Sequence, residues 1–86
     1  MISKICEKVS VNFVYNHINN TLLPKYLKWQ NRVYVIQKLG LHYTLYRGST
    51  LFHMFAVNSE DKYFLLSLDT DNLHWQLEEI ADNLTN

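Results

Sequence analysis

Apolar and polar residues alternate near the start of the chain, and this alternation predicts a β-strand over residues 8–16. Val9, Val11, Phe13 and Tyr15 alternate with Ser10, Asn12, Val14 and Asn16. A period of two residues suits a half-buried strand, whereas an amphipathic helix repeats every three to four residues. The next segment, 17–24, is rich in Asn and ends in Pro24, which is typical of a loop.

A first hairpin is predicted further along the chain. Residues 25–29 and 32–38 flank Gln30-Asn31, and Asn tolerates the positive φ that a tight turn needs. Alternation places Leu27 and Trp29 on the inner face of this hairpin. Gly40 follows inside a stretch that otherwise resembles a strand, so it predicts a bulge or a change of strand direction.

A second hairpin is predicted at Gly48-Ser49, because a Gly-X pair between two apolar stretches is typical of a type II′ turn. A two-residue loop sets Arg47 opposite Thr50, and counting outward from this pair gives the register of both strands. One face of the hairpin then carries His42, Thr44, Tyr46, Leu51, His53 and Phe55. The other face carries Leu41, Tyr43, Leu45, Phe52, Met54 and Ala56.

The last third of the chain predicts two more strands. Residues 62–68 form one of them, between polar turns at 58–61 and 69–72. Residues 73–80 alternate as a strand would, and the series of hairpins before them favours a strand. A helix is the alternative, because apolar residues also recur at helical spacing. They are Leu73, Leu77, Ile80, Ala81 and Leu84.

Together these elements predict an all-β protein. Six or seven short strands with tight turns indicate a small antiparallel barrel or a strongly curled sheet, SH3-like in size. A C-terminal helix would instead give a β-rich α+β fold, in which an antiparallel sheet carries one helix.

Composition indicates one folded domain over residues 1–86, with its core at about 8–80. The chain has 86 residues, of which 48% are hydrophobic, and contains two Gly and one Pro. It is too apolar for a disordered chain and too short for a large multi-step enzyme. Cys6 is the only cysteine, so no intrachain disulfide is expected. No signal-peptide core or membrane span is visible, and we therefore expect a cytoplasmic protein with no membrane association.

The zero net charge conceals an asymmetry between the two halves of the chain. Residues 1–48 carry seven Lys or Arg and one Glu, a net charge of +6. Residues 49–86 carry one Lys and seven Asp or Glu, a net charge of −6. Such a division is typical of a basic binding face with an acidic back, or of halves that attract each other within one copy or between copies.

One region resembles a known kind of protein. The run Pro24-Lys25-Tyr26-Leu27-Lys28-Trp29-Gln30-Asn31-Arg32-Val33-Tyr34-Val35 is followed later by Leu73-His74-Trp75-Gln76-Leu77. This Pro-x4-Trp-x2-Arg-x-Tyr opening with a closing Trp strand resembles short uncharacterised bacterial proteins, over about residues 8–80. The resemblance implies a compact β-rich intracellular domain without catalytic activity, and it transfers no site residue.

The sequence gives little support for a metal site or for a catalytic site. The predicted register brings His42 and His53 close enough to share a metal ion, with His74 as a third ligand, but their spacing matches no recognised metal motif. Gly-rich phosphate loops and nucleophile elbows are absent from the sequence. We therefore expect no metal, no cofactor and no enzymatic activity.

Binding of single-stranded nucleic acid is one hypothesis for the function. Such proteins combine cations that follow the backbone with aromatic side chains on which bases stack. The basic, aromatic-rich segment 25–47 supplies both kinds of residue: Lys25, Tyr26, Lys28, Arg32, Tyr43, Tyr46 and Arg47. A pI of about 6.9 is low for a dedicated nucleic-acid-binding domain, so this stays the alternative hypothesis.

The favoured hypothesis is a small non-enzymatic binding or protein-interaction module. Edge strands of a sheet present unpaired backbone groups that accept a strand from a partner protein or from another copy of the same chain. The predicted strand 8–16, with Lys4 and Lys8 beside it, is the expected edge.

Overall fold

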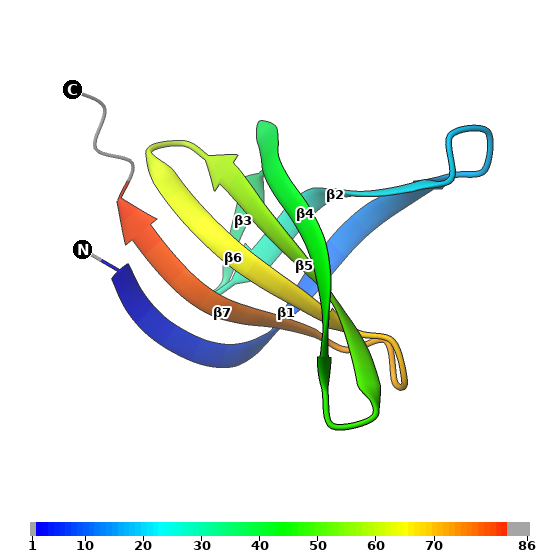
Figure 1. Cartoon of the computed structure of the whole chain (residues 1–86). Coiled ribbons are helices and arrows are strands. Elements are labelled where there is room, and N and C mark those ends of the chain that lie inside the picture. The colour runs from blue at the N-terminus through cyan, green and yellow to red at the C-terminus, as the bar shows by residue number, and fades with distance from the viewer. Residues whose placement is uncertain (1, 83–86) are drawn as a thin grey trace.

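The computed structural model describes residues 2–82, and within this range the chain forms seven antiparallel strands and no helix. The strands are β1 (Ile2–Asn16), β2 (Thr21–Trp29), β3 (Arg32–Val35), β4 (Lys38–Arg47), β5 (Thr50–Ser59), β6 (Lys62–Asp69) and β7 (Trp75–Asp82). They make one sheet in the order β3-β2-β1-β7-β6-β5-β4 (Figure 1). The predicted all-β class is confirmed, and the sheet is curled but not closed into a barrel. No helix in residues 2–82 is long and apolar enough to cross a membrane.

The C-terminal segment forms a strand, so the alternative of a helix is wrong. β7 lies between β1 and β6 and pairs with both, which satisfies its backbone hydrogen bonds on either side. Leu77 and Trp75 are buried, at two-residue spacing. Leu84, the last member of the helical pattern, lies outside the described residues.

β1 differs most from its prediction. It begins at Ile2, and Cys6 lies inside it with a φ of 55°, where the register between β1 and β7 shifts. The prediction of an edge strand is wrong for the strand as a whole, because β1 pairs with β7 through residues 2–9 and with β2 through residues 10–16. Residues 10–16 nevertheless have a strand on one side only. The edges of the sheet are β3 and β4. Local alternation cannot reveal the pairing of β1 with β7, since the two strands lie at opposite ends of the chain.

The turns predicted at Gln30-Asn31 and Gly48-Ser49 are confirmed. The predicted loop 17–24 is too long, because β2 begins at Thr21 and pairs with β1 through Pro24. Gln30 and Asn31 have φ of 52° and 61°, as a two-residue turn with two left-handed positions requires. Gly48 has a φ of 64°, in agreement with a type II′ turn, and β4 pairs with β5 in the predicted register from Leu41 to Arg47. The register shifts between Leu39 and Leu41, which makes Gly40 the predicted bulge.

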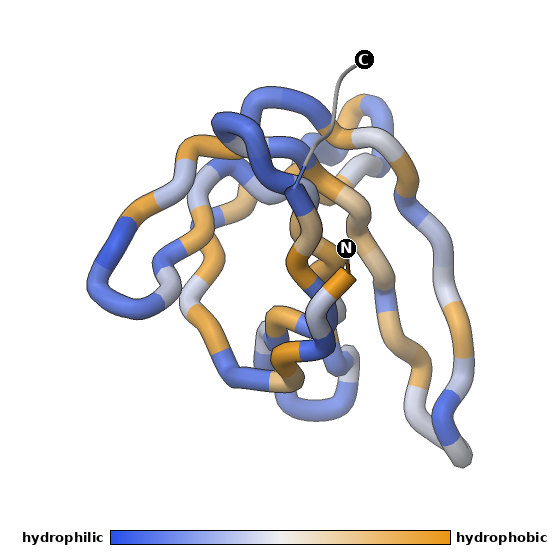
Figure 2. The backbone as a smooth tube through the Cα atoms, turned by 90° about the vertical axis from the view of Figure 1, so that its left-hand side faces the viewer, coloured by the Kyte–Doolittle hydropathy of each residue, from blue (hydrophilic) through white to orange (hydrophobic). Residues whose placement is uncertain are grey.

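The core lies on the inner, concave face of the curled sheet. Hydrophobic residues recur along the central strands, and hydrophilic stretches lie at the turns (Figure 2). The ring centroids of Tyr34 and Phe64 are 5.0 Å apart, which joins the β2–β3 part of the sheet to the β5–β6 part. The buried cluster consists of Leu27, Tyr34, Phe55, Val57, Phe64, Leu66, Leu68, Trp75 and Leu77.

One end of the curled sheet is held together and the opposite end is open. Gln37 N donates to Asn58 O at 2.9 Å, and the Arg32 guanidinium contacts the Glu60 carboxylate at 2.6 Å. These contacts hold the β3–β4 connection against the β5–β6 turn. At the other end the β1–β2 hairpin and the β4–β5 hairpin point away from each other (Figure 1).

Candidate functional site

The candidate site lies where β1 changes its pairing partner. Val9 is the last residue that pairs with β7, and Ser10 is the first that pairs with β2. Among the described residues, no strand pairs with residues 10–16 on the side where β7 lies. Half of a central strand thus behaves as an edge, and it faces the open end of the sheet.

The alternation of hydrogen bonds shows which backbone groups point to this side. In a two-residue hairpin the closing pair, here Trp29 and Arg32, is hydrogen-bonded, and such pairs alternate along the strands. Tyr26 and Lys28 therefore direct their backbone groups toward β1, where their partners are Asn12 and Ser10.

On β1, the residues that alternate with Ser10 and Asn12 direct their N–H and C=O groups away from β2. They are Val11, Phe13 and Tyr15. The register shift after Asn12 leaves this alternation intact, because its extra residue belongs to β2. Three residues of β1 thus offer backbone donors and acceptors to an added strand.

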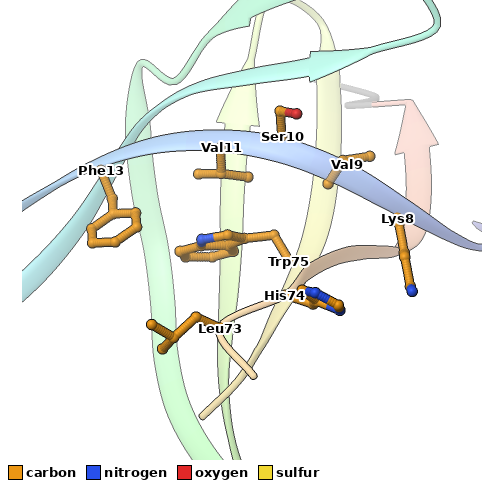
Figure 3. A pocket seen from close by; sticks show the side chains of 8 residues that line it. All are labelled: Lys8, Val9, Ser10, Val11, Phe13, Leu73, His74 and Trp75. Carbon is orange, nitrogen blue, oxygen red and sulfur yellow. The ribbon is translucent and has the colours of Figure 1, made fainter. Parts of the chain in front are cut away.

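A cleft of about 370 Å³ adjoins this unpaired half of β1 (Figure 3). Its apolar end surrounds the indole of Trp75, with Val11 on one side, Leu73 on the other and Phe13 beside the ring. Phe13 is 45% exposed and Leu73 68% exposed. Exposed apolar side chains around a buried aromatic ring are typical of a protein-binding surface.

Leu73 takes its position from the β6–β7 turn. Its φ is 62°, and its N–H donates to Asp69 O at 2.7 Å. This turn carries the chain away from β1 immediately before β7 begins. The space that an extended β7 would fill beside Val11 is therefore left open, with the Leu73 side chain at its margin.

Trp75 connects the cleft to the core. Its ring lies 5.6 Å from the Phe13 ring and 5.4 Å from the Phe55 ring, centroid to centroid. The Trp75 Nε1–H group is buried and has no hydrogen-bond acceptor within the described structure. A buried donor without an acceptor costs about 1–3 kcal/mol of stability.

The other end of the cleft is polar and basic. Lys8, Ser10 and His74 line it. None of the ion pairs found within residues 2–82 involves Lys8. The cleft thus combines an apolar pocket with a nearby positive charge.

A second hollow, of about 460 Å³, lies beside the other half of β1. There the Trp29 Nε1–H group donates to the Glu7 carboxylate at 3.1 Å, so both side chains already have a partner. Lys28, Gln30 and Asn31 complete a mainly polar lining. This hollow lacks the exposed apolar surface of the first cleft.

The residues of the predicted nucleic-acid interface do not gather on one surface. Tyr26 and Lys28 lie on the outer face of β2 and line a shallow hollow of about 350 Å³ with Val33. Lys25 is exposed next to them. Tyr43, also exposed, lies far along the sheet on the outer face of β4.

The other three residues of the predicted nucleic-acid interface lie elsewhere on the molecule. Tyr46 is exposed but lies on the inner face of β4, opposite to Tyr43. Arg32 stacks over a tyrosine ring and pairs with Glu60. Arg47 pairs with Glu78 at 3.3 Å, and that carboxylate also accepts a hydrogen bond from Ser67 at 2.6 Å.

The structure brings together two of the three candidate metal ligands. His42 Nε2 and His53 Nδ1 lie 2.8 Å apart and share a hydrogen bond, while His42 stacks on Phe55. Burial, and then the charge of His53, lowers the pKa of His42 below its ordinary value of 6.5. Within residues 2–82 no three metal-ligating side chains form a group, so His74 does not join this pair.

The cleft was not predicted from the sequence, although the sequence contains one indication of it. Phe13, Val14 and Tyr15 are three consecutive apolar residues at the end of a strand. Because successive side chains point to opposite faces, a strand with one face in the core cannot bury all three. All three are exposed in the structure. Leu73 and His74 reach the cleft only through tertiary structure.

Comparisons of the chain with protein-family models, with curated proteins and with solved structures find no match. The resemblance to short bacterial proteins stays a prediction.

Proposed function

We propose that this protein is a non-enzymatic protein-interaction module that binds an extended segment of a partner protein. The segment adds as a strand along residues 10–16 of β1 and places an apolar side chain beside Trp75. The single observation that carries the proposal is the change of partner in β1 at Val9 and Ser10, next to an apolar cleft.

Strand addition suits the geometry because its two components are both available. Backbone hydrogen bonds to the unpaired groups of β1 supply affinity for any extended chain, and pockets for alternate side chains supply specificity. The cleft provides one pocket, between Phe13 and Leu73. The charge of Lys8 at the other end favours a segment that carries an acidic residue near its apolar one.

The test is a selection from a library of random extended peptides on the wild-type protein, followed by binding measurements on variants. We expect the selected peptides to share an apolar position and to lose at least tenfold in affinity on Leu73→Glu, because burying a carboxylate in an apolar pocket is unfavourable. Tyr26→Ala is the matched control, since Tyr26 is exposed on the outer face. The amides of Val11, Phe13 and Tyr15 become protected from hydrogen exchange on binding.

Two results would contradict strand addition. Peptides that bind the Leu73→Glu variant as well as the wild type do not use the cleft. Peptides that still bind after methylation of their alternate backbone nitrogens do not pair with a strand, because methylation removes the donors.

Single-stranded nucleic acid is the second candidate ligand, and one cluster favours it. Lys25, Tyr26 and Lys28 lie together on the exposed part of β2. Anisotropy of labelled single-stranded RNA at low and at moderate salt tests this candidate, since binding through phosphates weakens steeply with salt. Salt-sensitive binding that Lys28→Ala weakens and Leu73→Glu leaves unchanged would favour nucleic acid over a peptide.

A further inference from the structure

We propose that the edge of β4 pairs with β4 of a second copy of this chain, in antiparallel orientation and centred on Thr44. This contact is separate from the β1 cleft, and the two surfaces lie on different strands.

The first argument is the exposure of the edge. From Leu39 to Tyr46 the strand carries no charged residue, and its only irregularity is the bulge at Gly40. Leu41 is 56% exposed and Tyr46 70% exposed. Proteins protect sheet edges by charges, short strands, prolines and bulges. From Leu41 to Tyr46 β4 has none of these, and such an edge associates readily with another strand.

The other edge of the sheet shows the contrast. β3 has four residues and begins with Arg32, so it is short and charged. β3 also leads directly into the β3–β4 connection, where Gln37 N donates to Asn58 O. Of the two edges, β4 alone is long and uncharged over its middle.

The second argument is the direction of the backbone groups. The Gly48–Ser49 turn makes Arg47 and Thr50 a hydrogen-bonded pair, and such pairs alternate along β4. The N–H and C=O groups of His42, Thr44 and Tyr46 therefore point away from β5. These are the groups that an added strand bonds.

The third argument is that β4 is complementary to itself. A two-fold axis at Thr44 sets Thr44 opposite its own copy, His42 opposite Tyr46, and Tyr43 opposite Leu45. Hydroxyl pairs, aromatic pairs and aromatic–aliphatic pairs are all favourable cross-strand combinations.

The charges at the strand ends agree with this arrangement. The two-fold axis brings Lys38 of one copy to the Gly48–Ser49 end of the other. Arg47 comes opposite Leu41 and keeps its own partner, Glu78. No like charges face each other across the contact.

The test depends on Thr44 of one copy lying opposite Thr44 of the other copy. Light scattering across a range of protein concentrations is expected to show a dimer for the wild type. Thr44→Lys and Thr44→Glu each place two like charges opposite each other and weaken dimerisation at least tenfold. An equal mixture of the two variants restores the dimer, because Lys then faces Glu.

Controls separate this contact from unfolding and from the cleft. Thr44 is exposed, so both variants should keep the circular dichroism spectrum of the wild type and unfold in one cooperative transition. Val33→Lys, on the β3 edge, and Leu73→Glu, in the cleft, should leave dimerisation unchanged. A wild type that is monomeric at every concentration overturns the proposal, and so does a mixture that fails to dimerise when each variant is folded.

Discussion

A hydrogen bond joins two histidines on the inner face of the β4–β5 hairpin. His42 and His53 lie 2.8 Å apart, so one ring nitrogen must accept and therefore must be unprotonated. His42 also stacks on Phe55 at 4.4 Å between centroids. Partial burial and the neighbouring imidazole both favour the neutral form of His42, which is why its pKa is lowered.

We expect the protein to lose stability as the pH falls below 6.5, the ordinary pKa of His42. Above that value His42 is neutral in the folded and unfolded states and makes no difference. Below it the unfolded chain takes up the proton first, so the free energy of unfolding decreases until the pH passes the lowered folded pKa. Urea unfolding above and below this range measures the change.

His42→Gln isolates the contribution of this group. Glutamine can still hydrogen-bond to His53 but does not titrate. The variant should lose less stability on acidification than the wild type does. Equal losses in both proteins would assign the pH dependence to other groups.

The β4–β5 hairpin contains two glycines with different roles. Gly48 has a positive φ and open space around it, whereas Gly40 lies at a bulge with a negative or extended φ. A Cβ at Gly40 would lie 3.4 Å from the Ala56 carbonyl oxygen, which is an ordinary contact. The backbone conformation, and not crowding, therefore makes glycine necessary at the turn.

Gly48→Ala should lower the free energy of unfolding by about 1–2 kcal/mol, because an L-residue with a Cβ is strained at this φ. Gly40→Ala is the matched control and should cost less. Chemical denaturation of the two variants gives the comparison. An alanine at Gly48 that costs no more than one at Gly40 would show that the turn changes its conformation to accommodate the new side chain.

The two parts of the curled sheet share one core. Tyr34 comes from β3 and Phe64 from β6, and their rings are in contact although the strands are far apart in the order of the sheet. Phe64 is fully buried. Such contacts across the concave face make the sheet curl, since each half buries its apolar face against the other.

Phe64→Ala should lower the free energy of unfolding by about 3–5 kcal/mol, a large share of the stability of a domain of this size. Val35→Ala, on the exposed part of β3, should cost much less. We expect both variants to unfold in a single transition by fluorescence and circular dichroism. Separate transitions for the two parts of the sheet would contradict a shared core.

The local features of this protein follow from its amino-acid sequence, because turns and alternation depend on neighbouring residues. Gln30-Asn31, Gly48-Ser49 and Gly40 predict two hairpins and a bulge, and the structure has all three at these positions. The register of β4 with β5 follows from the length of one turn.

The features that depend on distant residues come only from the tertiary structure. β7 pairs with β1 at the far end of the chain, which makes a predicted edge strand central and leaves only half of it paired on each side. The cleft at Trp75 exists because that pairing stops at Val9. The scattering of the basic and aromatic residues of segment 25–47 over different faces has the same origin. Strand order results from the free energy of burying the whole core, and no local pattern encodes it.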